Sequence, residues 1–367
     1  MKKRFGIFCL LLALLFSLVG CGKDTEYPPV ESTVEERETV MTLTDGNRAI
    51  DVPYELYRAL FLTYREEFDG GDVSLWAKEG SDALLEAISK KIVGRVSEIY
   101  AAISVARDIG FDAYGKEAED KIKAYIKAGV EGGYIDGMSV EGHGTYEAYL
   151  AYLESMHLNY SVQVLLFRYL ISLRAVQDYY LGTVDEYGNE VTAPVLVPTE
   201  EELRDFYFGE ESVRVLRIFL DGKSYTAEHA KKIRDTIAGK KSESAVAAYM
   251  IGQTTMPGSE VRKGYTFGRY TLESAYYEEV TRAAFALSVG ETSAPIATST
   301  GAETGYYILY RGAKSEENFA DAKDSIKENY LQNEVGKTLA AKRDSLGKSA
   351  KMTKTVDILS VLGGENA

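Results

Sequence analysis

The chain has 367 residues, a formal net charge of −14 at pH 7 and 45% hydrophobic residues. This length is enough for roughly two or three domains, and the acidic balance argues against nucleic acid or anionic polymers as partners. Its cysteines are Cys9 and Cys21 alone, so disulfides and thiolate zinc sites are excluded from the rest of the chain. No Walker, Gly-x-Ser-x-Gly or dinucleotide glycine motif is present, and we expect no cofactor.

The N-terminus has the layout of an export signal. A basic patch, Met1–Arg4, precedes an apolar run, Phe5–Val19. The run is shorter than the roughly 20 residues that a membrane-spanning helix needs, and a basic start followed by a short apolar stretch is typical of secretory signals. We therefore expect residues 1–20 to be a signal peptide.

This signal ends in Leu18-Val19-Gly20-Cys21, which resembles the lipobox of bacterial lipoproteins. In a lipobox, the cysteine thiol receives a diacylglycerol and cleavage occurs just before that cysteine. The resemblance implies that Cys21 is lipidated. Residues 21–45 are then expected to form a polar tether on the extracytoplasmic face of the cell membrane, in a Gram-positive bacterium. The alternative is an ordinary signal peptide with an incidental cysteine.

The region 46–204 is predicted to be mostly helical. Two apolar stripes recur at steps of three and four residues, the pattern of amphipathic helices. Their members are Leu85, Ile88, Ile92, Val96, Ile99 and Ile103, then Val162, Leu166, Tyr169, Leu173, Val176 and Tyr180. The glycine-rich stretch 129–144 is predicted to be a loop. Thr199 and Glu202 have the capping-box spacing, which predicts a helix from residue 200.

The pattern changes after residue 205. Val213–Leu220 is rich in β-branched residues and is followed by an Asp-Gly turn signal, which predicts a strand. The later elements are predicted as helices at about 226–238, 243–250, 275–287 and 315–346, and strands at about 265–270, 294–298, 305–311 and 356–361. Helices and strands in this order predict an α+β multidomain protein.

Four stretches resemble the parvulin domain, the rotamase module of PrsA- and SurA-type extracytoplasmic foldases. They are Val213–Leu220, Gly264–Gly268, Ala284–Ile296 and Gly305–Leu309, of which Ala284–Ile296 matches most closely. The flanking helices resemble that family's chaperone domain, which is built from N-terminal helices plus a long C-terminal one. The resemblance implies a helical chaperone-like domain over 46–204, an inserted parvulin-like domain over 205–313, and a segment 314–367 that packs on the helical domain.

The family's site residues are only partly present. Where the family has histidines in the first and last strands, this chain has Arg217 and Tyr307, and no cysteine or aspartate occurs at Met250–Gly252. Thr298 stands at the position of a family threonine that bonds the histidine pair. The resemblance assigns the catalytic positions to Arg217, Tyr307 and Thr298, and substrate binding to Phe267, Tyr276, Val280 and Phe285.

These departures predict weak or absent isomerase activity in a foldase or holdase for unfolded or nascent exported proteins. Two alternatives remain open. One is an assembly lipoprotein that uses the parvulin fold only to bind a partner, and the other is an active isomerase with rearranged catalytic groups. A homodimer is also left open. We expect no metal site, because Glu154 and His157, three apart on a predicted helix, have no second pair to complete one.

Overall fold

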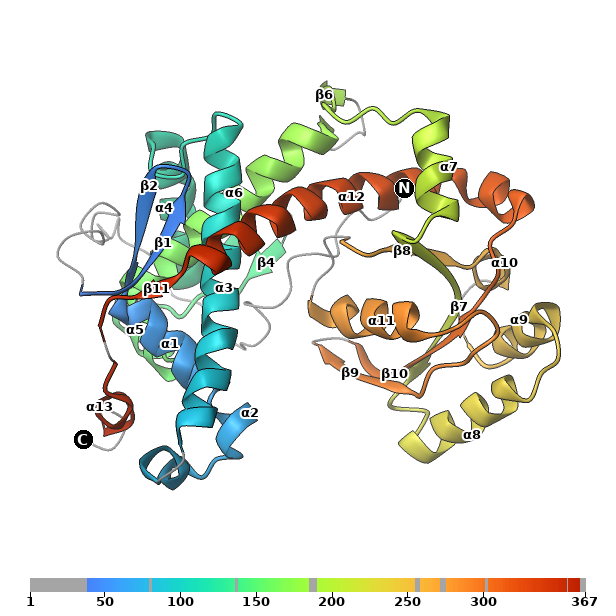
Figure 1. The fold of residues 1–367 in the computed structure, drawn as a ribbon, viewed down its shortest axis with the longest axis horizontal. Coiled ribbons are helices and arrows are strands. Elements are labelled where there is room, and N and C mark those ends of the chain that lie inside the picture. Colours follow the sequence, from blue (N-terminus) through green and yellow to red (C-terminus); the bar gives the residue numbers. More distant parts are fainter. Residues whose placement is uncertain are drawn as a thin grey trace. The chain divides into compact units, whose positions relative to one another are not determined.

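The computed structural model describes residues 38–78, 81–135, 138–184, 190–254, 258–270, 275–300, 303–354 and 356–363 (Figure 1). The chain divides into two compact units. The helical unit contains the described residues up to Thr192 and from Thr338 onward, and the sheet unit contains Ala193–Lys337. These boundaries differ from the predicted ones at 204/205 and 313/314. Among the described residues, no helix is both long and apolar enough to cross a membrane.

Most of the helical unit is built from α-helices. They are α1 Tyr54–Tyr64, α2 Glu66–Asp69, α3 Asp82–Asp108, α4 Lys116–Glu131, α5 Tyr146–Ser155, α6 Tyr160–Leu181, the second part of α12 Glu316–Ser349, and α13 Ile358–Gly363, with one 3-10 turn, η2 Val73–Ala77. The predicted stripe on α3 is buried from Ile88 to Ile99, and α3 packs against α6. Apolar periodicity therefore predicted the centre of this unit.

Short strands complete the helical unit. A sheet of order β11-β1-β2 is formed by β1 Thr39–Asp45, β2 Arg48–Pro53 and β11 Lys351–Met352; two hairpins are formed by β3 Gly133–Ile135 with β4 Met138–Val140, and by β5 Thr183–Val184 with β6 Glu190–Thr192. β1 overlaps the predicted tether, which is therefore wrong for residues 39–45. β2 and β11 pair with β1 on its two edges, and Val40, Met41 and Leu43 of β1 are buried.

Two further local predictions differ from the structure. The expected strand at 356–361 is wrong, because Ile358–Gly363 is α13; its buried Ile358, Val361 and Leu362 follow the three-to-four spacing of a helix. The expected loop at 129–144 is also only partly right. Helix α4 continues to Glu131, and the β3–β4 hairpin follows it.

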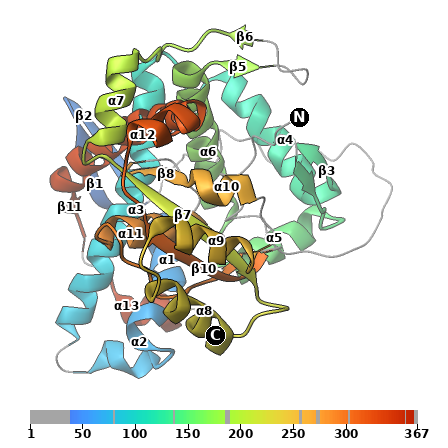
Figure 2. The same ribbon diagram turned by 90° about the vertical axis from the view of Figure 1, so that its right-hand side faces the viewer.

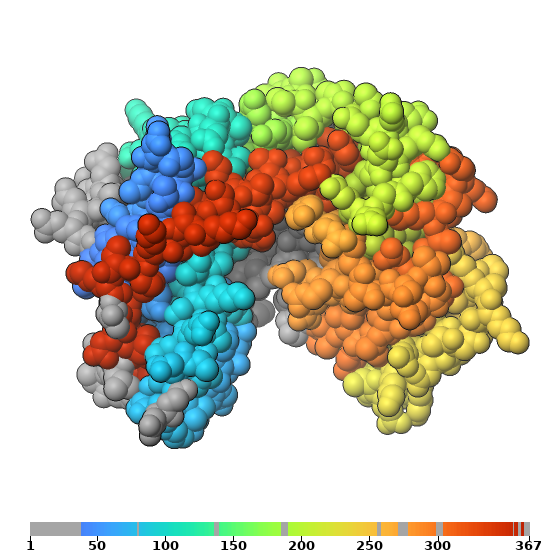
Figure 3. Space-filling model, viewed as in Figure 1, coloured from blue at the N-terminus to red at the C-terminus, as the bar shows by residue number. Residues whose placement is uncertain are grey.

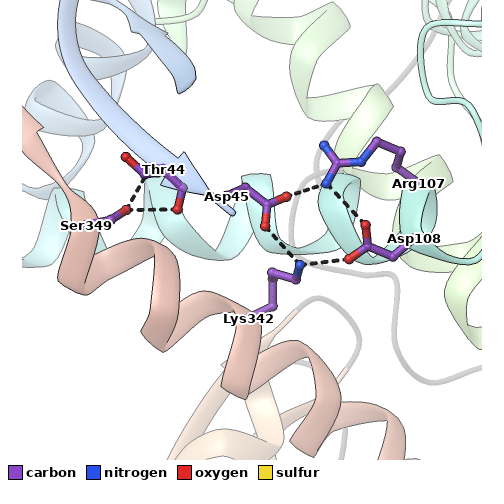
Figure 4. A network of polar contacts seen from close by, with 6 residues as sticks. All are labelled: Thr44, Asp45, Arg107, Asp108, Lys342 and Ser349. Carbon is purple, nitrogen blue, oxygen red and sulfur yellow. Dashed lines mark hydrogen bonds and ion pairs between the residues drawn. The ribbon is translucent and has the colours of Figure 1, made fainter. Parts of the chain in front are cut away.

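A polar network holds the end of α12 against the helical unit (Figure 4). Lys342 Nζ donates to Asp45 Oδ1 at 3.0 Å and to Asp108 Oδ2 at 2.8 Å, while Arg107 bonds both carboxylates. Ser349 Oγ accepts from the Thr44 backbone N–H at 2.7 Å. Burial opposes ionisation of Asp45, but hydrogen bonds from Arg107, Lys342 and Ser104 outweigh it and lower the pKa of Asp45 to about 2.

The sheet unit is an antiparallel sheet covered by helices on both faces. Its elements are α7 Glu200–Phe208, β7 Ser212–Asp221, α8 Ala227–Ala238, α9 Glu243–Ile251, α10 Gly258–Lys263, β8 Tyr265–Gly268, α11 Ala275–Ala286, β9 Ile296–Thr300, β10 Glu303–Arg311 and the first part of α12. The strand order is β8-β7-β10-β9. Figures 1 and 2 show α8 and α9 on one face of this sheet and α11 on the other.

The residues of β7 alternate between two cores. Leu216, Ile218 and Leu220 belong to the core beneath α8 and α9, whereas Val213 and Val215 belong to the core beneath α11. This period of two is what a strand buried on both faces requires. The same period places Arg217 and Phe219 on the α11 side, where the candidate site lies.

Candidate functional site

The site is the α11-side face of the sheet, at the end where β7 runs toward Asp221. The register sets Arg217 of β7 opposite Leu309 of β10, and Phe219 opposite Tyr307. On the other side of β7, Tyr265 and Phe267 of β8 pair with Val215 and Val213. Antiparallel pairing puts directly opposed side chains on the same face. The register alone therefore brings a cation and four aromatic rings to one surface.

Arg217 lies among these rings. Its guanidinium carbon is 3.7 Å from the centroid of the Tyr265 ring, 5.4 Å from that of Tyr307 and 6.0 Å from that of Phe267. Distances up to about 6 Å give a favourable cation–π interaction. Arg217 is half-buried, as is Tyr265. The position where the resemblance expects a histidine is thus filled by a guanidinium stacked on aromatic carbon.

Tyr307, the second predicted position, is 4% exposed. Its ring centroid lies 5.0 Å from that of Phe219, at an interplanar angle of 45°. Phe219 in turn covers Gly305, because a Cβ added at Gly305 would lie 2.7 Å from the Phe219 ring and 2.2 Å from the Leu220 carbonyl oxygen. Glycine is required at that position for the close approach of β7. Tyr307 therefore lies within a packed wall of the site.

Thr298 lies on the same face, on β9, two strands away from Arg217 of β7. It pairs with Gly305, whereas Ile296 is the β9 residue that faces Tyr307. Thr298 and Tyr307 are therefore diagonal neighbours on adjacent strands, at a Cα separation of roughly 7–8 Å. The Thr298 Oγ1 atom is buried and has no hydrogen-bond partner within the described part of the chain.

The predicted substrate-binding residues are divided. Phe267 and Val280 are buried together in the core under α11, 3% and 1% exposed, and Phe285 packs half-buried at its margin. Arg269 stacks on Phe285, with its guanidinium carbon 4.6 Å from the ring centroid. Tyr276 lies on α11, but its side chain is outside the described residues, as is Cys21. Sequence reasoning missed Tyr265 and Phe219, although the period of two along β7 and β8 would have placed both beside Arg217.

Positive charge gathers on this side of the sheet. Arg311 of β10 lies opposite Val215, diagonal to Arg217, and its Nη1 donates to the Ala284 carbonyl at 3.0 Å. Burial lowers the pKa of Arg311 from its ordinary value. Neither Arg311 nor Arg269 forms a salt bridge with a carboxylate among the described residues. One carboxylate lies beside these arginines, because Glu260 Oε2 accepts from the Tyr265 hydroxyl at 3.3 Å.

This chain is similar to foldase proteins of the PrsA type. No family model matches the chain. The foldase protein PrsA of Caldanaerobacter subterraneus subsp. tengcongensis is 26% identical over 197 residues, which is 53% of this chain and 60% of the relative. The predicted resemblance to PrsA-type foldases is confirmed. The matched region spans less than two thirds of the relative's length.

Solved structures of PrsA are also similar to this chain. Foldase protein PrsA from Streptococcus pneumoniae is 18% identical with a TM-score of 0.29, covering 75% of this chain and 88% of that one. PrsA from Bacillus subtilis is 16% identical with a TM-score of 0.24, covering 75% and 90%. PrsA from Lactococcus lactis is 17% identical with a TM-score of 0.23, covering 89% and 98%. The predicted α+β class is confirmed by the structure itself, in which one unit is mostly helical and the other is built on a four-stranded antiparallel sheet with helices.

Proposed function

We propose that this chain is an extracytoplasmic protein-folding factor that binds unfolded or nascent exported proteins, and that its parvulin-like site has lost most or all isomerase activity. The main observation is the Arg217 guanidinium, stacked 3.7 Å from the Tyr265 ring centroid where a family histidine is expected. The similarity to PrsA supports the role in folding.

The loss of activity follows from what prolyl rotation needs. The rotation has a barrier near 20 kcal/mol and breaks no bond, so a catalyst must bind the twisted imide more tightly than the planar one. An apolar surface for the prolyl ring and a neutral hydrogen-bond network supply that difference. The charged Arg217 guanidinium lies over the Tyr265 ring, and the Tyr307 ring packs against Phe219. Neither residue provides both an apolar surface for the prolyl ring and a neutral hydrogen-bond network.

Client binding without catalysis is compatible with the composition. Unfolded chains present apolar side chains and backbone groups, and tyrosine offers an apolar face with a polar tip for both. The chain has 27 tyrosines. Attachment through Cys21 is part of this proposal, because a lipidated cysteine with two or more acyl chains anchors a protein stably to a membrane. The charge pattern and lipobox-like motif of the first 21 residues support it.

Two assays on one preparation of residues 22–367 test the proposal. One follows cis/trans exchange of an Xaa-Pro peptide, and the other follows light scattering from an unfolded, cysteine-free client. We expect suppressed aggregation. We expect cis/trans exchange to take about as long as the uncatalysed reaction, tens of seconds. Fast exchange that Arg217→Ala or Tyr307→Phe removes would show instead an active isomerase with rearranged groups. Absence of both activities would favour an assembly protein with one fixed partner.

A further inference from the structure

The outer surface of helix α5, in the helical unit, combines aromatic rings from three segments. Tyr146 and Tyr152 are half-buried on α5, and each contacts one ring from outside the helix. The ring centroid of Tyr146 lies 6.0 Å from that of Tyr160, and the centroid of Tyr152 lies 4.4 Å from that of His143, at an interplanar angle of 26°. Leu150, one turn after Tyr146, packs against the same core as the three tyrosines. We call this set the α5 surface: Tyr146, Leu150, Tyr152, Tyr160 and His143.

Tyr149 connects the two ring pairs. It is 4% exposed, and its ring centroid lies 5.7 Å from that of His143. Burial, and to a smaller extent the neighbouring phenols of Tyr160, Tyr146 and Tyr152, raise the pKa of Tyr149. Burial likewise raises the pKa of Tyr160 to about 12. The phenols of Tyr149 and Tyr160 are therefore uncharged at neutral pH, and they belong to one aromatic surface.

Carboxylates border the α5 surface. Glu147 and Glu154 are exposed on α5 and lie about two turns apart along one stripe of the helix, with Leu150 between them. Glu141 lies near the other ring pair, because burial lowers the pKa of His143 and the charge of Glu141 acts against this. None of the three carboxylates forms an ion pair with another residue in the described part of the chain.

Cations are absent from this stretch of the sequence. There is no lysine or arginine between Lys127 and Arg168. A tyrosine elsewhere in the helical unit has a cation of the chain itself, since the Arg168 guanidinium carbon lies 4.4 Å from the ring centroid of Tyr114. Over the Tyr152 ring, no cation lies among the residues that the structure describes. Ring faces and carboxylates both attract cations, so the α5 surface has this attraction to offer to another chain.

A segment that carries lysine or arginine next to apolar residues matches this surface. Its apolar side chains can cover the rings, and its cations can bind a ring face and the carboxylates. An acidic segment would bring like charges together. Glu147 and Glu154 are about 10 Å apart along the helix axis. Three or four residues of an extended segment cover the same distance, so two cations of one segment can reach both carboxylates.

We propose that the α5 surface binds unfolded client segments in which lysine or arginine stands beside apolar residues. The proposal rests on the function proposed above, and it names both the class of client segment and the part of the helical unit that accepts it. The rings of Tyr146 and Tyr152 bind the apolar side chains, while Glu147 and Glu154 select for the cations.

The test uses two nonapeptides labelled with an uncharged dye. They are identical except that the central Lys-Leu-Phe-Ser-Lys of one is Gln-Leu-Phe-Ser-Gln in the other. Binding to residues 22–367 is followed by fluorescence anisotropy at about 0.05 M salt, where surface charges are weakly screened. Two ion pairs and a cation–π contact are expected to make the lysine peptide bind about tenfold more tightly.

The double variant Glu147→Gln with Glu154→Gln is expected to reduce this preference to about twofold, because both ion pairs are lost. The matched control is Glu201→Gln with Glu317→Gln. It removes the same charge from two exposed positions of the sheet unit that form no ion pair among the described residues, and it is expected to keep the tenfold preference. Tyr152→Leu, which keeps an apolar side chain, is expected to lower the preference to about fourfold.

A charge reversal gives a gain that damage to the fold cannot imitate. Glu147→Lys with Glu154→Lys is expected to favour a third peptide, with glutamate at both lysine positions, over the lysine peptide. Circular dichroism of each variant checks that it is folded. Equal binding of the lysine and glutamine peptides to the unaltered chain, an equal loss in the control variant, or no change of preference after charge reversal overturns the inference.

Failure of this inference is distinguishable from failure of the proposed function. Suppressed client aggregation with no preference for the lysine peptide removes only the basic selectivity. A clear lysine preference without any suppression of aggregation leaves the α5 surface as a binding site and removes the folding role.

Discussion

Arg214 is the buried charge on which the sheet unit depends most, and its removal gives the sharpest prediction. Arg214 is 2% exposed. Its Nη1 donates to Glu243 Oε1 at 2.6 Å and to the Ala313 carbonyl at 3.1 Å, while its Nη2 and Nε reach the carbonyls of Arg262 at 3.2 Å and Lys263 at 3.3 Å. One side chain thus joins the start of α9, the end of α10 and the exit of β10.

Truncation by Arg214→Ala leaves a partly buried carboxylate and three carbonyls without this donor. Breaking a buried pair by removing one partner costs about 3–5 kcal/mol. We take the lower end, about 3 kcal/mol, because the Glu243 side chain is 33% exposed and water can solvate it. Since about 1.4 kcal/mol corresponds to a factor of ten, amide protection in β7 and β10 should fall by more than 100-fold.

Hydrogen exchange read by mass spectrometry measures this unit separately from the helical one. The control is Arg282→Ala, an exposed i,i+4 pair on the same unit, both of whose side chains are 69% exposed. Such pairs contribute less than about 0.5 kcal/mol, so its protection should change by no more than about twofold. A loss of amide protection of less than tenfold in Arg214→Ala would refute the reasoning. It would mean that water solvates the three carbonyls and Glu243 with little loss of stability.

Four further outcomes are expected. In the helical unit, the pKa of Asp45 is lowered to about 2 from its ordinary 3.8, so its ionised form stabilises the fold fully above pH 4. This contribution of about 1–2 kcal/mol is lost as pH falls toward 2, and Lys342→Met should reduce the loss, measured by urea unfolding. Gly305→Ala should destabilise the sheet unit by about 1–3 kcal/mol in the same exchange assay, because its Cβ would lie 2.2 Å from the Leu220 oxygen. Asp69→Ala removes the acceptor of the Trp76 indole N–H, 2.7 Å away and buried, so the emission of this sole tryptophan should shift and stability should fall by about 1–3 kcal/mol. Arg217→Met should destabilise the sheet unit by about 0.5–2 kcal/mol in the same exchange assay, because it removes the cation–π contact of the guanidinium with the Tyr265 ring.

The sequence predicted the elements whose periodicity is set by burial. The stripe Ile88–Ile99 on α3 and the strand at Val213–Leu220 are examples, because each is set by a pattern of residues along a single element. The capping box of α7 was also predictable, and the Thr199 Oγ1 atom accepts from the Glu202 N–H at 3.2 Å as the spacing requires. Local rules suffice where the partner groups lie within one turn.

Contacts between distant segments were not predictable in the same way. Residues 39–45 become β1 because residues 48–53 and 351–352 pair with them, and no local signal shows that β11 lies about 300 residues further on. The burial of Arg214 could not be found from the sequence, because its partners lie 29 to 99 positions away. The rings around Arg217 come from three strands, so predicting its environment requires the register of β8, β7 and β10. The sequence showed only that an arginine stands where the family has a histidine.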